Sequence, residues 1–585
     1  MVDEHRSRSA VRKIKMIRRS RSKEEVMRGI SLKLIALYGK KKGVYALSRV
    51  EEILSRCTTA KKKKCVSQKD VILITYGDTI RGKKKPLIVL GEFLEKYVGD
   101  SINTVHILPF YPFSSDRGYS VIDYRKVNPH FGNWVNISNI HKRYKLVFGA
   151  VINHVSVRCK WFRNFLMCDP AYQDYFISFE RRNAISQSNM EKVTRPRTTP
   201  LLTKFRTRKG FRYVWTTFGS DQPDLNYRNP EVFLEMVKVL LFYAEKGADI
   251  IRLDAVAYIW KELGTNCLNR RQVHLIVKLF RDILKLADHH TMLLSEINLP
   301  QEQNIAYFGK GTDESHMIYD FALPPLLLYT FYKGNARILS RWASELRVKS
   351  DEDFIFNILD SHDGIGLFPV AHILTKNQIA LIVKTVEAKG GFVSYRTRAG
   401  KRIPYELNIT WSSALKDGDE ELSIKRYLCS RAIALAMEGI PGVYIQGLMG
   451  LEDDLDRVFM TGVKRDINRS ILDSSKVAEV LESEDSKERR VFSEFKKLIK
   501  IRTGQKAFHP VGVQKVLFLN DRVFSVLRTY KSETVLAIHN VSRERQKVNT
   551  RKMRVKTACD VVSGKKISDG IVLEPYQFMW VKCVR

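Results

Sequence analysis

Three acidic residues each follow a short apolar run in this sequence of 585 residues: Asp254, Glu296 and Asp363. Apolar runs of this length are typical of strands buried in a parallel sheet, so the three carboxylates would meet at one end of that sheet. Carboxyl groups held together can break a glycosidic bond. One attacks or stabilises an oxocarbenium-like sugar centre, and another protonates the departing oxygen. The pattern therefore points to chemistry on glycosides.

The residues around these carboxylates suit that chemistry. Arg252 lies two positions before Asp254, on the same face of the strand, where it can keep an attacking carboxylate ionised. Glu296 follows an apolar strand, and burial would raise its pKa as a proton donor requires. If neighbouring strands of a barrel carry Asp254 and Glu296, they can stand about 5–5.5 Å apart, the spacing of retaining enzymes. His362 and Asp363 could bind sugar hydroxyls.

A structural alternative exists for Arg252 and Asp254, because an isolated pair of this kind can be a buried ion pair at a strand end. Glu296 and the His362-Asp363 pair at matching strand ends favour the catalytic interpretation. Arg469 likewise follows a polar turn, where a surface salt bridge is the alternative to a site role.

The elements that must position these residues are eight short apolar strands that alternate with helical stretches, such as 230–246 and 271–287. This alternation predicts an α/β fold, a closed (β/α)8 TIM barrel with its active site at the C-terminal ends of the strands. The predicted strands are 71–75, 104–110, 146–153, 249–255, 292–297, 316–321, 354–359 and 442–446.

Three further parts flank or interrupt the predicted barrel, which spans residues 69–505. Residues 1–68 are a basic N-terminal extension, with a partly disordered tip and two helices indicated by helical spacing. The polar stretch 179–203 is too long for a barrel connection, so a small inserted domain is expected at about 155–214, after strand 3. Residues 506–585 predict a C-terminal antiparallel β domain, with strands at 523–529, 533–540 and 572–582.

The composition is strongly basic, with 100 Lys and Arg against 63 Asp and Glu and a net charge of +37. Such a field can attract phosphate, or nucleic acid and acidic membranes without specificity, although an ordinary solvated basic surface is the favoured explanation. The 8 cysteines show no metal or redox spacing. Neither a secretory leader nor a membrane-spanning run is predicted, which favours the cytoplasm. We expect no cofactor, no metal site, no specific nucleic acid and no membrane insertion.

Several motifs together give the sequence a family resemblance. It resembles the alpha-amylase superfamily through Asn153-His154, Arg252-x-Asp254, Glu296 and His362-Asp363. Within the superfamily it looks like the sucrose phosphorylase subfamily, especially the glucosylglycerate phosphorylase-like branch. The stretches that carry this are Ile-Leu-Pro-Phe-Tyr-Pro at 107–112, Asp-Arg-Gly-Tyr-Ser-Val-Ile-Asp-Tyr at 116–124, Gln-Pro-Asp-Leu-Asn-Tyr at 222–227, Ser-His-Asp-Gly-Ile-Gly at 361–366 and Arg-Asp-Ile-Asn-Arg at 465–469.

The resemblance implies a role for each motif residue. Asp254 would be the nucleophile, Glu296 the general acid/base and Asp363 the transition-state stabiliser. The implied reaction is a double displacement: a glucosyl-enzyme forms, and inorganic phosphate, as co-substrate, attacks it to give α-glucose 1-phosphate. The glucosyl ring would contact Asp116, His154, Arg252, His362 and Arg469, with Tyr119 and Phe218 as aromatic walls, and the acceptor would contact Gln222, Tyr258 and Asn298.

Some of these assignments have purely structural alternatives. Tyr119 and Phe218 could simply pack in the core, and Asn153-His154 could be a satisfied structural pair. In relatives that bind calcium the strand-three Asn can be a ligand, but sucrose phosphorylase relatives generally lack the ion, so none is expected here. The resemblance leaves a monomer and a homodimer equally open.

The sequence also departs from the family pattern. Gly149 stands where the strand-three motif has Asp, and Asn298 stands where sucrose phosphorylases carry His. Ile297, Gln301 and Phe368 differ from the glucosylglycerate branch, which has Arg-Pro where this chain has Phe368-Pro369. Three functions stay open: a glucoside phosphorylase acting on an α-glucoside such as glucosylglycerate or sucrose, a retaining α-glucoside hydrolase or transglucosidase, and a catalytically weakened carbohydrate-binding barrel.

Overall fold

The computed structural model describes residues 22–57, 66–196, 199–287, 289–310, 312–346, 348, 350–398, 401–549, 557–567 and 570–584. The predicted basic tip at the N-terminus lies outside the described residues. Among the described helices, none combines the length and the apolar character that crossing a membrane requires.

Eight parallel strands close into a barrel at the centre of the chain, as the sequence predicts. Each strand hydrogen-bonds to the next one along the chain, and the last closes on the first. Nearly all of their side chains are buried, because helices cover the outside and side chains fill the inside. The strands are β1 (Ile72–Thr75), β3 (Thr104–Ile107), β4 (Lys145–Val151), β8 (Ala248–Asp254), β9 (Met292–Ser295), β10 (Met317–Asp320), β11 (Phe354–Asn357) and β15 (Ile440–Tyr444).

Amphipathic helices surround the barrel and begin at recognisable caps. The Asn229 side chain accepts from the Glu231 N–H at the start of α7, where Pro230 occupies the first turn. Thr375 and Gln378 form a capping box at the start of α12. The principal helices are α3 (Pro86–Phe93), α4 (Trp134–His141), α7 (Pro230–Glu245), α8 (Arg271–Leu286), α10 (Leu323–Lys333), α11 (Arg337–Glu345), α12 (Lys376–Ala388), α14 (Glu420–Ala436), α17 (Ser474–Glu482) and α18 (Lys487–Gly504).

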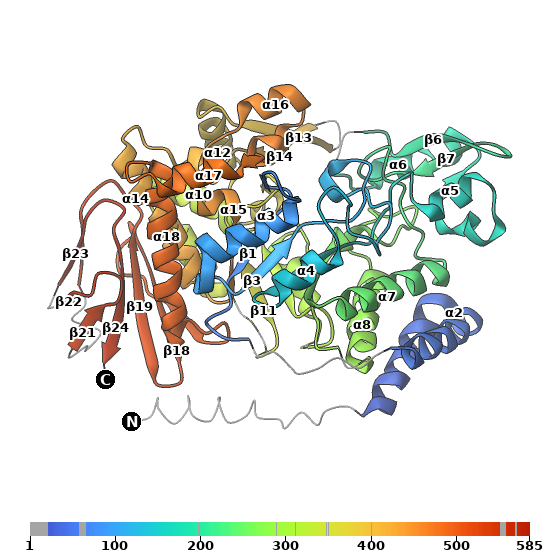
Figure 1. Cartoon of the computed structure of the whole chain (residues 1–585), viewed down its shortest axis with the longest axis horizontal. Coiled ribbons are helices and arrows are strands. Elements are labelled where there is room, and N and C mark those ends of the chain that lie inside the picture. The colour runs from blue at the N-terminus through green and yellow to red at the C-terminus, as the bar shows by residue number, and fades with distance from the viewer. Residues whose placement is uncertain are drawn as a thin grey trace.

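The N-terminal extension is helical, as expected, and lies against α7 and α8 (Figure 1). Its element α2 (Lys23–Ser55) has two arms that meet at Gly39, where φ is 77°. The arms pack closely, since a Cβ on Gly43 would lie 2.7 Å from the Ile35 Cα. Lys33 Nζ anchors the extension to Asp282 on α8 at 2.7 Å.

The small insert follows β4, in the predicted place. Its three antiparallel strands are β5 (Ser178–Phe179), β6 (Leu202–Thr207) and β7 (Gly210–Trp215), with the short helices α5 (Lys160–Leu166) and α6 (Gln187–Lys192) beside them. Figure 1 shows this insert and the C-terminal sheet on opposite sides of the barrel.

A second antiparallel sheet lies between β11 and α14 and was not predicted. It contains β12 (Ile365–Gly366), β14 (Lys401–Asn408) and β13 (Phe392–Arg398), in that order. The first of these strands begins two residues after Asp363, so this sheet starts at the predicted site.

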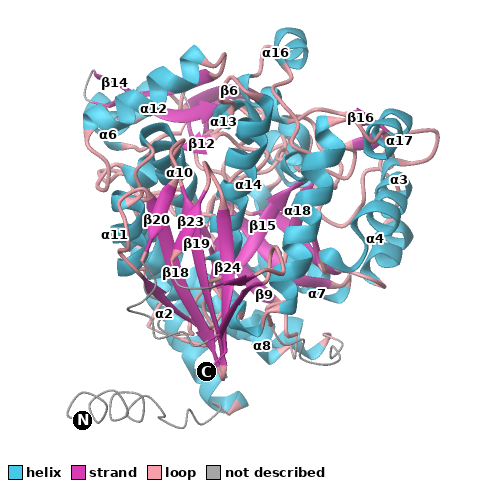
Figure 2. Ribbon diagram, turned by 90° about the vertical axis from the view of Figure 1, so that its left-hand side faces the viewer, coloured by secondary structure: helices cyan, strands magenta, loops and turns pink. Residues whose placement is uncertain are grey.

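The C-terminal part is antiparallel, as predicted. The six-stranded sheet contains β17 (Val513–Val516), β18 (Val523–Tyr530), β19 (Glu533–Asn540), β24 (Phe578–Val584), β21 (Thr557–Asp560) and β22 (Lys566–Ile567), and β20 (Gln546–Val548) pairs with β23 (Ile571–Leu573). Figure 2 shows β18, β19 and β24 of this main sheet facing the viewer, with α18 beside them. The prediction of one strand over 572–582 is wrong, since β23 and β24 belong to different sheets. Pro575 lacks the N–H that a continuous ladder needs, and Tyr576 has φ 55°.

Candidate functional site

A cavity of about 90 Å³ is lined by residues at the C-terminal ends of the barrel strands. All thirteen residues predicted for the site line it: Asp116, Tyr119, His154, Phe218, Gln222, Arg252, Asp254, Tyr258, Glu296, Asn298, His362, Asp363 and Arg469. They come from segments that are far apart in sequence, and the closed barrel brings them together.

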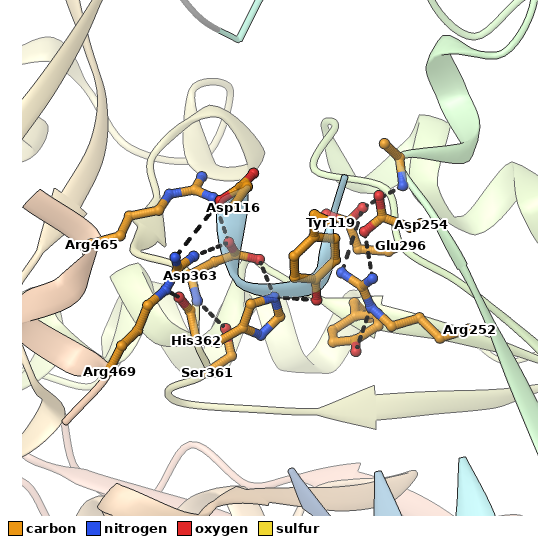
Figure 3. A network of polar contacts seen from close by, with 12 residues as sticks. Asp116, Tyr119, Arg252, Asp254, Glu296, Ser361, His362, Asp363, Arg465 and Arg469 are labelled. Atoms are coloured by element: carbon orange, nitrogen blue, oxygen red, sulfur yellow. Dashed lines mark hydrogen bonds and ion pairs between the residues drawn. The ribbon is translucent and has the colours of Figure 1, made fainter. Parts of the chain in front are cut away.

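Arg252 organises one side of the cavity (Figure 3). Its Nη1 donates to Asp254 Oδ1 at 2.5 Å, and its Nη2 lies 3.8 Å from Glu296 Oε2. Its Nε donates to the Tyr319 hydroxyl at 3.1 Å, which fixes the guanidinium plane from below. Asp254 and Glu296 therefore lie near one another, as expected, since both carboxylates contact the guanidinium of Arg252.

Glu296 has surroundings that differ from those of Asp254. The Ala255 N–H donates to Glu296 Oε2 at 2.8 Å. Burial raises the pKa of Glu296 to about 7, with help from the negative charges of Asp254 and Asp363 and against the opposing effect of Arg252. A carboxyl group with this pKa carries its proton for part of the time near neutral pH, which suits a group that both gives and takes a proton.

A second cluster surrounds Asp363. Arg465 Nη1 donates to Asp363 Oδ1 at 2.5 Å, and Arg469 Nη2 lies 3.8 Å from the same oxygen. Burial would raise the pKa of Asp363, but the contact with His362 and the positive charges of Arg465 and Arg469 outweigh it and hold the pKa well below its usual range. Asp363 therefore stays an anion while Glu296 exchanges its proton.

Tyr119 and His362 connect the two clusters, as Figure 3 shows. Their rings stack at 5.3 Å between centroids, and the Tyr119 hydroxyl lies 2.6 Å from His362 Nε2. Burial lowers the pKa of His362 to about 3, so its 3.3 Å contact with Asp363 Oδ2 is a hydrogen-bond contact of a neutral ring. Tyr119 is a buried residue of the core and also lines the cavity.

Arg469 and Gln222 both approach Asp116. Arg469 Nη1 lies 3.8 Å from Asp116 Oδ1, and Gln222 Nε2 donates to Asp116 Oδ2 at 3.3 Å. The Arg469 Nε donates to the His362 carbonyl at 2.7 Å, and the Arg469 residue is only 2% exposed. The alternative of a surface salt bridge for Arg469 is therefore wrong.

His154 and two aromatic residues form another wall. The His154 Nε2–H donates to the Tyr119 carbonyl at 2.9 Å, so its Nδ1 accepts from Asn153 Nδ2 at 3.2 Å. The Phe218 ring lies 5.2 Å from the His154 ring and 5.4 Å from the Tyr258 ring. These three rings give the cavity an apolar surface on which a sugar ring can pack.

Strained backbone occurs at the site, as it does at several other described residues. Ala255, directly after Asp254, has φ 47°, and Asp116 and Arg117 both have φ 50°. Non-glycine residues in this left-handed region cost about 1–3 kcal/mol each and are found where the surroundings enforce them. The strained turn after Asp254 places the Ala255 N–H on Glu296.

The sequence did not identify Tyr405, Glu406 and Arg465, which also line the cavity. Glu406 pairs with Arg465 through two hydrogen bonds, one of them 2.9 Å long. Tyr405 and Glu406 lie on β14, in the sheet that was not predicted. A hairpin signal was available, because alternating runs at 392–398 and 401–408 flank a glycine-containing break.

The departures from the family pattern lie in different places. Ile297 lines the cavity, whereas Gly149, Gln301 and Phe368 are not among the lining residues. Gly149 is the strand partner of Arg252, and a Cβ there would lie 3.2 Å from the Pro109 Cγ. The Gln301 side chain accepts from the Trp342 Nε1–H. Gly149, which stands where the family motif has Asp, therefore lies close to Pro109. Its strand partner Arg252 is held by Asp254 and Tyr319.

Asn153 contacts a buried ammonium group behind the cavity. Lys261 Nζ donates to Asn153 Oδ1 at 2.6 Å and lies 2.7 Å from Asp224 Oδ2, and both charged side chains are almost fully buried. Asp224 also accepts from the Thr217 N–H at 2.8 Å. This network holds Asn153, which directly precedes His154 and donates to its ring. Asn153 therefore helps to position His154.

Replacing Lys261 with Met is expected to destabilise the protein by about 3–5 kcal/mol, because it leaves the buried Asp224 carboxylate without its partner charge. Lys238→Met is the matched control, since Lys238 and Glu235 form a partly exposed pair at 2.7 Å worth about 0–1 kcal/mol. Urea unfolding of both variants measures the difference. Equal losses for the two variants would contradict the structural role given to Lys261.

Comparisons with known proteins agree with the geometry. Residues 96–363 match the alpha amylase catalytic domain model. The chain is 41% identical over 513 residues to a glucosylglycerate phosphorylase of Spirochaeta thermophila, covering 87% of this chain and 86% of that protein. It is 38% identical over 559 residues to the Escherichia coli glucosylglycerate phosphorylase, covering 93% and 98%.

A solved structure is similar over almost its whole length. The crystal structure of sucrose 6F-phosphate phosphorylase from Thermoanaerobacter thermosaccharolyticum superposes with a TM-score of 0.74 at 26% sequence identity, covering 87% of this chain and 99% of that one. The chain therefore belongs to the alpha-amylase family and, within it, to the family of glucosylglycerate and sucrose phosphorylases.

Proposed function

We propose that this protein is a retaining glucoside phosphorylase that transfers a glucosyl group from an α-glucoside, such as glucosylglycerate or sucrose, to inorganic phosphate. The observation that carries the proposal is the pair formed by Asp254 and Glu296. Both contact Arg252, and the pKa of Glu296 is about 7. The family of relatives supports glucosylglycerate as the first substrate to test.

In the first step Asp254 attacks the anomeric carbon and forms a β-linked glucosyl ester. The bond to the leaving oxygen breaks, and Glu296 gives its proton to that oxygen. Arg252 orients the attacking carboxylate through its 2.5 Å contact. Asp363, held as an anion by Arg465 and Arg469, stabilises the positive charge that develops on the sugar ring.

In the second step a phosphate oxygen attacks the same carbon from the face that the leaving group vacated. Glu296, now a carboxylate, takes the proton from phosphate, and Asp254 departs. Two inversions give α-glucose 1-phosphate with retained configuration.

The remaining predicted residues would bind the substrate. Asp116, His154, His362 and Arg469 would contact the hydroxyls of the glucosyl ring, and Tyr119 and Phe218 would face its apolar surface. Gln222, Tyr258 and Asn298 would contact the acceptor. The net charge of +37 supports attraction of phosphate. A cytoplasmic location, where free phosphate is available, belongs to the same proposal.

Incubation of the protein with glucosylglycerate, with and without phosphate, tests this function. We expect α-glucose 1-phosphate and glycerate when phosphate is present, followed by ¹H and ³¹P NMR. Formation of free glucose at equal rates in both samples would contradict the phosphorylase proposal and favour a hydrolase. Parallel samples with sucrose and sucrose 6-phosphate identify the acceptor.

A further inference from the structure

A second cavity, of about 770 Å³, lies away from the predicted catalytic residues. Its lining residues come mostly from the segment 122–125, from α5 and from α7, and Figure 1 shows these two helices on the same side of the barrel. The described residues that line this cavity and those that line the catalytic cavity do not overlap. Volumes of about 300–1,000 Å³ are typical of sites that bind small molecules. The second cavity is therefore large enough to hold a ligand of its own.

Four cationic side chains line the second cavity: Arg125, Arg158, Lys160 and Arg163. All four are exposed, and within the described part of the chain none of them has an acidic partner. In this they differ from Arg252 in the catalytic cavity, which contacts two carboxylates. Their charges are thus available to an anion that enters from solution.

The two carboxylates of this wall already have cationic partners. Glu235 Oε1 lies 2.7 Å from the Lys238 Nζ, and Asp123 Oδ2 lies 3.4 Å from the Lys126 Nζ. Asp123 Oδ1 also accepts from the Arg125 N–H at 2.9 Å. Neither lysine lines the cavity. The cavity wall therefore carries an excess of positive charge, and a concave wall of one sign raises the local concentration of the opposite ion.

An aromatic ring and three free polar groups accompany the cations. Trp161 lines the cavity and stacks on Tyr124, with 5.7 Å between the ring centroids and 27° between the planes. The Trp161 indole N–H, the Asn164 amide and the Tyr172 hydroxyl also belong to lining residues, and no described residue hydrogen-bonds to them. A ring of a ligand can pack on an indole, and its hydroxyls or ring nitrogens can bind these polar groups. A bare inorganic anion would use none of them.

The floor of the cavity is held in place by the barrel. The Tyr124 hydroxyl donates to the Val151 carbonyl at 2.6 Å and to the His154 carbonyl at 3.3 Å, both at the end of β4. Tyr124 is buried, so its ring gives Trp161 a fixed surface to stack on. A ligand would therefore find the aromatic part of the site already formed, which lowers the cost of binding.

We propose that this cavity is a second binding site, for a small phosphate ester that carries a ring, as sugar phosphates and nucleotides do. The phosphate group contacts the four cations, and the ring packs on Trp161 within reach of Asn164 and Tyr172. The inference does not depend on the proposed glucosyl transfer, because it uses no residue of the catalytic cavity.

Isothermal titration calorimetry with AMP, glucose 6-phosphate and inorganic phosphate tests the inference. We expect at least one of the two esters to bind the wild-type protein more tightly than inorganic phosphate, and the tighter ester identifies the kind of ring. The double variant Arg158→Gln, Arg163→Gln should weaken binding of that ester by about 10- to 100-fold, the effect of losing charge-assisted contacts. Arg206→Gln is the matched control, because Arg206 is an exposed cation on β6 of the same insert that does not line the cavity.

Trp161→Leu separates the ring from the charge. It should weaken ester binding by about 10-fold and leave inorganic phosphate unaffected. An unchanged unfolding temperature shows that the variant is folded. The proposal would be overturned if neither ester bound, if both bound no more tightly than inorganic phosphate, or if the double variant bound the ester like the wild type. Binding of a single-stranded RNA that the double variant loses, with no binding of either ester, would instead mark a nucleic-acid surface and would also overturn it.

Discussion

Asp254→Ala is expected to lower the turnover of an α-glucoside by about 10⁴- to 10⁶-fold, the range found when a covalent nucleophile is removed. The side chain is held 2.5 Å from the Arg252 Nη1 at the end of β8, whereas Glu296 lies 3.8 Å from the Arg252 Nη2. Without Asp254 the glucosyl ester cannot form. The release of fluoride from α-glucosyl fluoride measures the loss.

Azide separates a missing nucleophile from a misfolded protein. In Asp254→Ala, azide can enter the vacated space and attack the α-glucoside directly, so the product should be β-glucosyl azide. Asp254→Asn is the second variant, since its amide can still accept from Arg252 and should preserve the unfolding temperature. α-Glucosyl azide from the alanine variant would contradict the nucleophile assignment.

Glu296→Gln is expected to lower kcat/KM for a glucoside with a poor leaving group by about 10²- to 10⁴-fold, the usual contribution of general acid catalysis. The loss should be smaller with α-glucosyl fluoride, because fluoride needs less protonation to depart. With azide this variant should give α-glucosyl azide, since azide then intercepts the glucosyl ester on Asp254. Product configuration thus distinguishes the two carboxylates.

The pH profile gives a second test of Glu296. Glycoside cleavage needs the protonated carboxyl, whose pKa is about 7, so kcat/KM should fall as the pH rises through 7. Glu296→Gln should lose this alkaline limb. Asp320→Asn is the matched control, because Asp320 is a buried carboxyl with a pKa raised to about 7 that does not line the cavity. Persistence of the limb in Glu296→Gln, or its loss in Asp320→Asn, would contradict the assignment.

The barrel could be predicted because its strands are short apolar runs, and several of these runs are followed by charged residues. Asp254, Glu296 and Asp363 mark three such ends, and the parallel arrangement places those ends together. The strand at 572–582 was predicted wrongly, because a run of apolar residues hides the break that Pro575 introduces. The antiparallel sheet after β11 was missed because it interrupts a barrel connection, where helix is the usual expectation.

The thirteen predicted residues line the cavity because each belongs to a motif at a strand end or to the loop that follows it. The structure alone identified three further lining residues, which are Arg465, Glu406 and Tyr405. Arg465 reaches Asp363 across about a hundred positions of sequence, and its bidentate partner Glu406 lies on the unpredicted sheet. Such contacts depend on how a connection folds back over the barrel, which local periodicity does not specify.

The central claim is that Asp254 carries the glucosyl group during the reaction. 5-Fluoro-α-glucosyl fluoride forms such an ester quickly and releases it slowly, so the protein can be trapped and digested, and its peptides identified by mass spectrometry. The account predicts one added fluoroglucosyl group per chain, attached to Asp254 and removed when phosphate is added. A label on Glu296 or Asp363, or turnover of the reagent with no covalent label at all, would contradict it.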